Sequence, residues 1–282
     1  MARLPVKPTA LWSVVKEIRA ATEDFRPVLV AGAPEPAGAL RAELVACGDE
    51  GAVRDLSGRE VTGYDLEGAR VLVYFVDGAR PSAEDEATLR RADRADVEIV
   101  CVLVGEGPEE TADVPHVLAT EIVSVRPDEE LPVERIAERI AERAGDSGYV
   151  LAAKLPALRR AVCEDIIRGF ARQNGILGAA VFIPGADLPV LTLNQIRMVL
   201  RLAAAHGEEI DRERALELLP IVAAGFGLRA VARELAAVVP VAGWAVKGAV
   251  AFTGTRALGE AALAYFEKGG AKGVARSVRS RS

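Results

Sequence analysis

Side chains able to do chemistry are few and scattered in this sequence. The three cysteines stand at positions 47, 101 and 163, an odd number without a CxxC pair. This pattern argues against a disulfide framework or a zinc site and fits a reducing cytoplasm. The two histidines, His116 and His206, lie 90 positions apart without clustered partners. We therefore expect no metal site, no cofactor and no histidine-based catalytic pair.

The segment after the first apolar run is where a phosphate-binding loop would stand. Such a loop reads GxxxxGK[ST]: glycines let backbone N–H groups face the phosphates, the lysine neutralises charge, and the hydroxyl binds magnesium. With Gly32 as the first glycine, Gly38 occupies the lysine position. With Ala33 first, Ala39 replaces the lysine and Leu40 the hydroxyl. Both registers fail, so the sequence predicts no nucleotide binding and no catalytic residue.

The residues inside this segment also oppose a phosphate. Pro34 and Pro36 remove N–H donors, and Glu35 places a negative charge where phosphate oxygens would lie. What the segment can do instead depends on the strands and helices that hold it.

Residues 25–146 alternate between short apolar runs and helical patterns. The expected strands are 28–31, 71–76, 99–104 and 121–125, and the expected helices are 37–46, 82–95 and a helix opened by Pro132. This alternation predicts right-handed crossovers, a parallel sheet and hence an α/β domain. Ahead of it, residues 1–24 hold a helix capped by Thr9, which we expect to pack on this first domain.

The order of these elements resembles the translation-factor class of GTPase domains over roughly residues 25–145. Two runs carry the resemblance, Val71-Leu-Val-Tyr-Phe-Val-Asp-Gly-Ala-Arg-Pro-Ser and Ile99-Val-Cys-Val-Leu-Val, with a helix between them. The resemblance implies a P-loop GTPase-like fold in degenerate form. A guanine-specificity NKxD loop would follow the second run, where Gly105-Glu-Gly-Pro-Glu stands.

The GTPase DxxG element has two matches, Asp55-Leu-Ser-Gly58 and Asp65-Leu-Glu-Gly68. About one such match arises by chance in a chain of this composition, so neither match carries weight alone. An ordinary doubly wound scaffold unrelated to GTPases remains the alternative for this domain, and a GTPase that uses unconventional contacts is a further one.

Net charge divides the chain in two. Residues 1–150 carry 17 basic and 30 acidic groups, a net charge of −13, whereas residues 151–282 carry 18 and 11, a net charge of +7. We place the joint at Gly145–Gly148, where one helical pattern ends. Residues 149–268 then show helical spacing throughout, and small residues in the last helix, such as Gly248, permit close helix packing.

This second half resembles the helical domain of the YcjF-like family of unknown function, a domain that often follows GTPase domains. The resemblance covers roughly residues 149–268 and rests on three runs. They are Gly175-Ile-Leu-Gly-Ala-Ala-Val-Phe-Ile-Pro-Gly-Ala-Asp-Leu-Pro, Leu193-Asn-Gln-Ile-Arg-Met and Val238-Val-Pro-Val-Ala-Gly-Trp-Ala-Val-Lys-Gly-Ala-Val-Ala. Some members of the family look like inner-membrane proteins, and the resemblance brings no catalytic residues.

Length decides whether this half could cross a membrane. Its longest charge-free runs, 173–186 and 235–246, have 14 and 12 residues, against about 20 for a span. Residues 235–255 would be long enough only if Lys247 were accepted, at about 3 kcal/mol. Basic residues in the tail at 269–282, and Lys268 just before it, could add attraction to anionic lipid. Those in the tail are Lys272, Arg276, Arg279 and Arg281. A soluble helical bundle and a membrane-attached or membrane-inserted half therefore both stay open.

These observations predict a non-catalytic scaffold or regulatory adaptor. Its pseudo-GTPase domain would present an acidic surface to a protein partner, and its helical domain would serve self-association or membrane docking, with Trp244, Lys247 and the basic tail as contact residues. We expect a cytoplasmic protein, alone or held at the inner membrane by its C-terminal half. Nucleic acid is not expected as a partner, because the chain is acidic and its basic groups lack interleaved aromatics.

Overall fold

The structure is a computed structural model that describes residues 8–78, 80–105, 114, 116–118, 122–180, 188–218 and 243–269. It contains two compact units. One unit is continuous, Asp24–Val162, and the other joins Met1–Glu23 to Cys163–Ser282. The first is an α/β unit and the second is helical, so the predicted α/β domain with a parallel sheet and the helical region are confirmed.

The α/β unit is built on one parallel sheet. Its strands are β1 (Val28–Gly32), β2 (Val53–Ser57), β3 (Val71–Asp77), β4 (Glu98–Val104) and β5 (Val123–Val125). They lie in the order β2-β1-β3-β4-β5, and every neighbouring pair is parallel. This is one of the two common orders of doubly wound sheets, in which the chain changes direction between β1 and β3.

Strand β2 is absent from the strands expected from sequence. Only Val53 and Leu56 of its five residues are buried, while Arg54 and Asp55 are exposed. An edge strand contacts the sheet along one side only, so it needs no continuous apolar run and escapes a search for one.

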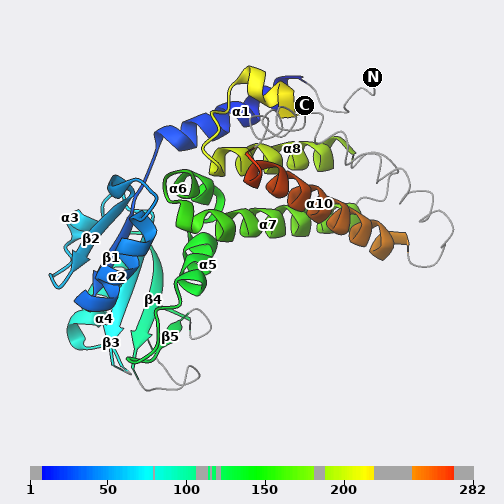
Figure 1. Ribbon diagram of the computed structural model, residues 1–282. Helices are drawn as coiled ribbons and strands as arrows, with labels where there is room; N and C mark the ends of the chain where they lie inside the picture. The colour runs from blue at the N-terminus through cyan, green and yellow to red at the C-terminus, as the bar shows by residue number, and fades with distance from the viewer. Residues whose placement is uncertain are drawn as a thin grey trace, which may run out of the picture. The chain divides into compact units, whose positions relative to one another are not determined.

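Helices cover both faces of the sheet (Figure 1). The contacts of α2 (Pro34–Val45) are with β1, β2 and β3, and those of α5 (Val133–Ala144) are with β3 and β4. The buried residues of α3 (Gly63–Leu66) and α4 (Ala83–Arg94) join a separate apolar cluster with the opposite side of the strands. Two-sided cover explains why the central strands read as continuous apolar runs.

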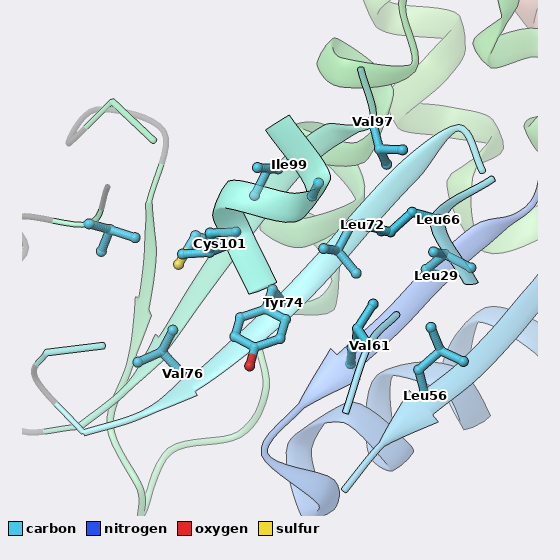
Figure 2. Close-up of a cluster of buried hydrophobic side chains, with 14 of the residues drawn as sticks. Leu29, Leu56, Val61, Leu66, Leu72, Tyr74, Val76, Val97, Ile99 and Cys101 are labelled. Atoms are coloured by element: carbon cyan, nitrogen blue, oxygen red, sulfur yellow. The ribbon is translucent and has the colours of Figure 1, made fainter. Parts of the chain in front are cut away.

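Figure 2 shows this second cluster, which takes alternate residues from β1, β3 and β4. Leu29 from β1, Leu72 from β3 and Cys101 from β4 are completely buried in it. Tyr74 joins them because its hydroxyl donates a hydrogen bond of 2.8 Å to Asp85 at the start of α4. The carboxylate of Asp85 also accepts from the backbone N–H and the hydroxyl of Ser82, which caps α4. One carboxylate thus fixes both the helix start and the buried phenol.

The α/β unit extends beyond the joint expected at Gly145–Gly148. Gly145 does end α5, with a φ of 56°, but α6 (Gly148–Lys154) and the short 3-10 helix Pro156–Leu158 fold back onto this unit. The N–H of Asp49 donates to the carbonyl of Lys154 at 2.9 Å, and their side chains form an ion pair at 2.7 Å. The boundary therefore lies at Val162, inside α7 (Arg159–Ala180).

The first helix, α1 (Pro8–Glu23), belongs to the helical unit and not, as the sequence predicts, to the α/β unit. It lies beside α8 (Leu188–Ala205), and Glu17 pairs with Arg197 and Arg201 of that helix. The apolar spacing of α1 correctly identifies its buried side. Spacing cannot identify the partner, which lies far along the chain.

Helices α7, α8 and α10 (Gly243–Glu267) form the body of the helical unit, together with a helical segment at 212–218. Small residues let α7 and α10 approach closely, as expected. A Cβ on Gly248 would lie 2.9 Å from the carbonyl oxygen of Gly175 and 3.0 Å from the Cβ of Ala179. Asp211 caps the 212–218 segment by accepting from the N–H of Arg214 at 2.7 Å. Within the described ranges, no helix is long and apolar enough to span a membrane.

Candidate functional site

The carboxyl edge of the sheet is the first candidate site, because open α/β sheets bind ligands there. Strand β1 ends at Gly32 and α2 begins at Pro34, so Ala33 alone separates them. The expected loop through Pro36 does not exist, because proline at the first position of a helix extends α2 back to the strand. A phosphate loop has no room here.

The residues that we aligned with the phosphate loop lie on two different elements. Gly32 ends β1, whereas Gly38, Ala39 and Leu40 lie inside α2. Leu40 is completely buried in the core. None of the three residues on the helix therefore occupies a position from which a loop lysine or hydroxyl would reach a phosphate.

The first turn of α2 offers little to an anion. Pro34 and Pro36 have no N–H group, and the N–H of Ala37 donates to the carbonyl of Ala33 at 3.2 Å. Only Glu35 keeps an N–H for a ligand in this turn, and its own exposed carboxylate repels anions. This helix N-terminus is thus unsuited to phosphate.

The backbones of β1 and β3 lie close together where β1 ends. Gly32 has a φ of 92°, and a Cβ added to it would lie 2.0 Å from the carbonyl oxygen of Phe75. The N–H of Ala33 donates to the same oxygen at 2.9 Å, and the N–H of Gly58 donates to the carbonyl of Gly32 at 3.2 Å. A Cβ on Gly58 would in turn lie 3.3 Å from Pro34 Cγ. At the end of β1 the backbone therefore leaves no room for a side chain at position 32.

The structure separates the two DxxG matches. Asp55–Gly58 lies at the carboxyl end of β2, where Gly58 touches the end of β1. Asp65–Gly68 lies in and after α3, ahead of β3, and Asp65 forms a capping box with Thr62. Only the first match stands at the edge that a nucleotide phosphate would occupy.

The carboxylate of Asp55 is held by its own turn. It accepts hydrogen bonds from the hydroxyl of Ser57 at 2.6 Å and from the N–H of Ser57 at 2.9 Å. These bonds lower the pKa of Asp55, so the group is an anion at neutral pH. An anion at this place adds to the repulsion of phosphate.

The buried groups of the α/β unit are poor acid–base catalysts. Burial, with a smaller contribution from the charge of Asp85, raises the pKa of Cys101 to about 12. Burial and the hydrogen bond to Asp85 also raise the pKa of Tyr74 above its ordinary value. Both groups stay protonated at neutral pH, so neither supplies a nucleophile or base.

The histidines are held by local contacts. His116 Nδ1 lies 3.0 Å from a carboxylate oxygen of Asp93, and His206 Nδ1 lies 2.8 Å from the carbonyl oxygen of Leu202. In the part of the chain that the structure describes, no group of three or more histidine, cysteine or acidic side chains could hold a metal ion.

The contact residues expected in the helical half are only partly visible. Lys247 on α10 and Lys268 just after it are exposed. Trp244 lies on α10, but its side chain falls outside the described part of the structure, as do Lys272, Arg276, Arg279 and Arg281. Their role in binding a partner or a membrane stays a prediction.

Sequence reasoning missed a buried polar network in the helical unit. The amide of Asn174 on α7 donates to Thr255 Oγ1 on α10 at 2.9 Å, and Gln195 on α8 donates to the same oxygen at 3.2 Å. Asn194 on α8 donates to Asn174 Oδ1 at 2.9 Å. The network links three helices, and its signal in the sequence is a polar residue on the apolar side of each.

Comparisons of the chain with protein-family models, with curated proteins and with solved structures found no match. The two family resemblances drawn from sequence therefore stay expectations. The functional proposal rests on the geometry where β1 ends and on that of the helical unit.

Proposed function

We propose that this protein is a non-catalytic scaffold or regulatory adaptor, with a pseudo-GTPase α/β domain and a helical domain that associates with a partner. One observation carries the proposal: α2 begins at Pro34, a single residue after the end of β1, and leaves no loop to hold a phosphate. A nucleotide switch requires such a loop, whereas a scaffold does not.

The position of Asp55–Gly58 supports the degenerate GTPase form of this proposal over an unrelated scaffold. In a GTPase the DxxG element must face the phosphates, and here Gly58 contacts Gly32 at the end of the neighbouring strand. This contact supports the first match as a remnant of a DxxG element, beside a helix start in place of a phosphate loop. Loss of the ligand with retention of the scaffold is the pattern expected of a pseudoenzyme.

The charge of the α/β unit supports a partner of opposite sign. Residues 24–162 carry 28 acidic and 16 basic groups, a net charge of −12. An acidic unit repels phosphates and nucleic acid, and it steers cationic protein surfaces during association.

Isothermal titration of the purified chain with GTP and with ATP, each with magnesium, tests the proposal. We expect no affinity tighter than about 100 μM. The variant Gly38→Lys should also bind neither nucleotide, because its lysine would lie within α2. This residue has open space around its Cβ position, so the variant should fold. Saturable binding by the parent chain would refute the proposal and favour a GTPase with unconventional contacts.

A further inference from the structure

Helix α1 binds the helical unit through one apolar side. The residues it buries follow helical spacing; they are Leu11, Val14, Val15 and Ile18. The helix lies beside α8, which comes much later in the chain (Figure 1). An amphipathic helix thus lies with its apolar side on a surface formed by α8 and Arg212, which we call the groove.

Charged contacts fix the position of α1 in this groove. The two carboxylate oxygens of Glu17 are divided between two arginines of α8: Arg201 at 3.0 Å and Arg197 at 3.1 Å. The guanidinium of Arg201 also lies over the ring of Phe170 on α7, 5.4 Å from its centre. Two successive turns of α8 thus present their cations to a single carboxylate.

A second contact lies nearer the start of α1. The guanidinium of Arg212 lies over the ring of Trp12, 4.7 Å from its centre. The groove therefore contacts three features of the helix: its apolar side, an aromatic ring and a carboxylate five positions after that ring.

The covalent attachment of α1 is slight. Residues 24–27 join it to β1 without forming a helix or strand, and Phe25 lies under Lys154 in the α/β unit, 4.7 Å from the ring centre. Glu17 and Arg201 are 184 positions apart. The groove therefore holds α1 by non-covalent contacts, as a receptor holds a peptide.

We propose that this groove is a helix-binding site with α1 as its displaceable resident ligand, and that it recognises an amphipathic helix by the carboxylate at the position of Glu17. The inference deepens the adaptor function, since it names the surface on which a partner helix would replace α1. The existence of a partner helix rests on the proposed adaptor function, whereas the binding of α1 in the groove does not. Nucleotide titration and helix exchange can fail independently of each other.

The test uses the full chain with a protease site inserted between Glu23 and Asp24. After cleavage, the N-terminal fragment should stay bound during gel filtration, because the groove holds it without the covalent link. A fluorescent synthetic peptide of residues 8–23 should then replace it, with a rise in anisotropy that saturates. The uncleaved chain should bind the peptide at least about tenfold more weakly, because its tethered helix competes at high local concentration.

Two altered peptides test recognition of the carboxylate. Glu17→Ala should bind about fivefold to tenfold more weakly, a modest loss because the Glu17 side chain is partly exposed in both ion pairs. Glu23→Ala, at an exposed position on the same helix, is the matched control and should bind as the parent does. Equal affinities for the two altered peptides would overturn recognition by Glu17. A cleaved fragment that neither stays bound nor is replaced by the peptide would overturn the site itself.

Discussion

The two units of this protein hold their interiors together by different means. The described part of the α/β unit buries apolar side chains almost exclusively, with Thr88 as the buried polar exception. The helical unit buries a set of polar residues, namely Asn174, Thr192, Asn194, Gln195, Arg201 and Thr255. Apolar contacts tolerate small shifts, whereas hydrogen bonds require one geometry. The sheet therefore sets its arrangement by backbone pairing, and the helices set their register by side chains.

The largest effect should come from cutting the α/β unit at the wrong place. A fragment of residues 24–162 should fold cooperatively alone, whereas a fragment of residues 25–146 should not. The shorter fragment loses Leu155 and Leu158, both completely buried, and each such side chain contributes about 1.5–3 kcal/mol. Circular dichroism during urea unfolding checks this. A cooperative transition in the shorter fragment would return the boundary to Gly145–Gly148.

A methyl group at the end of β1 should have the next largest effect. Gly32→Ala places a Cβ 2.0 Å from the Phe75 carbonyl oxygen at a φ of 92°, so the strands must separate at a cost of about 3 kcal/mol or more. Gly38→Ala, inside α2 with open space around it, should stabilise the unit by about 0.5–1 kcal/mol. Urea unfolding of both variants measures the contrast, and similar midpoints would contradict the close approach of Gly32 to the Phe75 carbonyl.

The polar network of the helical unit should show an intermediate effect. Thr255→Val removes the oxygen that accepts from Asn174 and Gln195, which leaves two buried donors unpaired and costs about 1–3 kcal/mol. Thr253→Val is the control on the same helix, since Thr253 is exposed and bonds the carbonyl of Ala249. Its stability should change by less than about 0.5 kcal/mol. Thermal unfolding that fails to separate the two variants would argue against a network that fixes the helices.

The smallest expected effect is on the stability of the α/β unit at acidic pH. Hydrogen bonds from Thr62, with help from Arg59, lower the pKa of Asp65 in the folded α/β unit. A lowered pKa means that the stabilisation is present above the unfolded value of about 3.9 and is lost as the pH falls through the folded value. Asp65→Asn should therefore flatten the loss of stability below about pH 4. The control Thr62→Ser keeps the hydroxyl and should retain the parent dependence of stability on pH. If Asp65→Asn also leaves that dependence unchanged, the contribution of Asp65 is contradicted.

The contrast between the α/β unit and the helical unit also explains what could be predicted from the sequence. Continuous apolar runs identified β1, β3 and β4, because strands covered on both faces have few polar positions. The resulting α/β class and the helical region are confirmed. Strand β2 was not predicted, because it lies at the edge of the sheet. The short connection after β1 was not predicted either, because proline begins a helix as readily as it bends a loop.

The candidate site was less accessible from sequence than the fold. The absent lysine and hydroxyl of the phosphate loop were visible in the residue types, but the close approach of Phe75 to Gly32 depends on strand register. In the helical unit, periodicity marked buried sides without showing which polar residues meet. Asn174 and Thr255 are 81 positions apart, and the partners of α1 lie still farther along the chain.

The long separation between α1 and its groove also affects synthesis. Glu17 leaves the ribosome 184 residues before Arg201, an interval of roughly 10–40 s at about 5–20 residues per second. During that time the whole α/β unit is made, while Leu11, Val14 and Ile18 have no groove to enter. Throughout this interval the apolar side of α1 therefore stays exposed as hydrophobic surface, while the α/β unit can already fold.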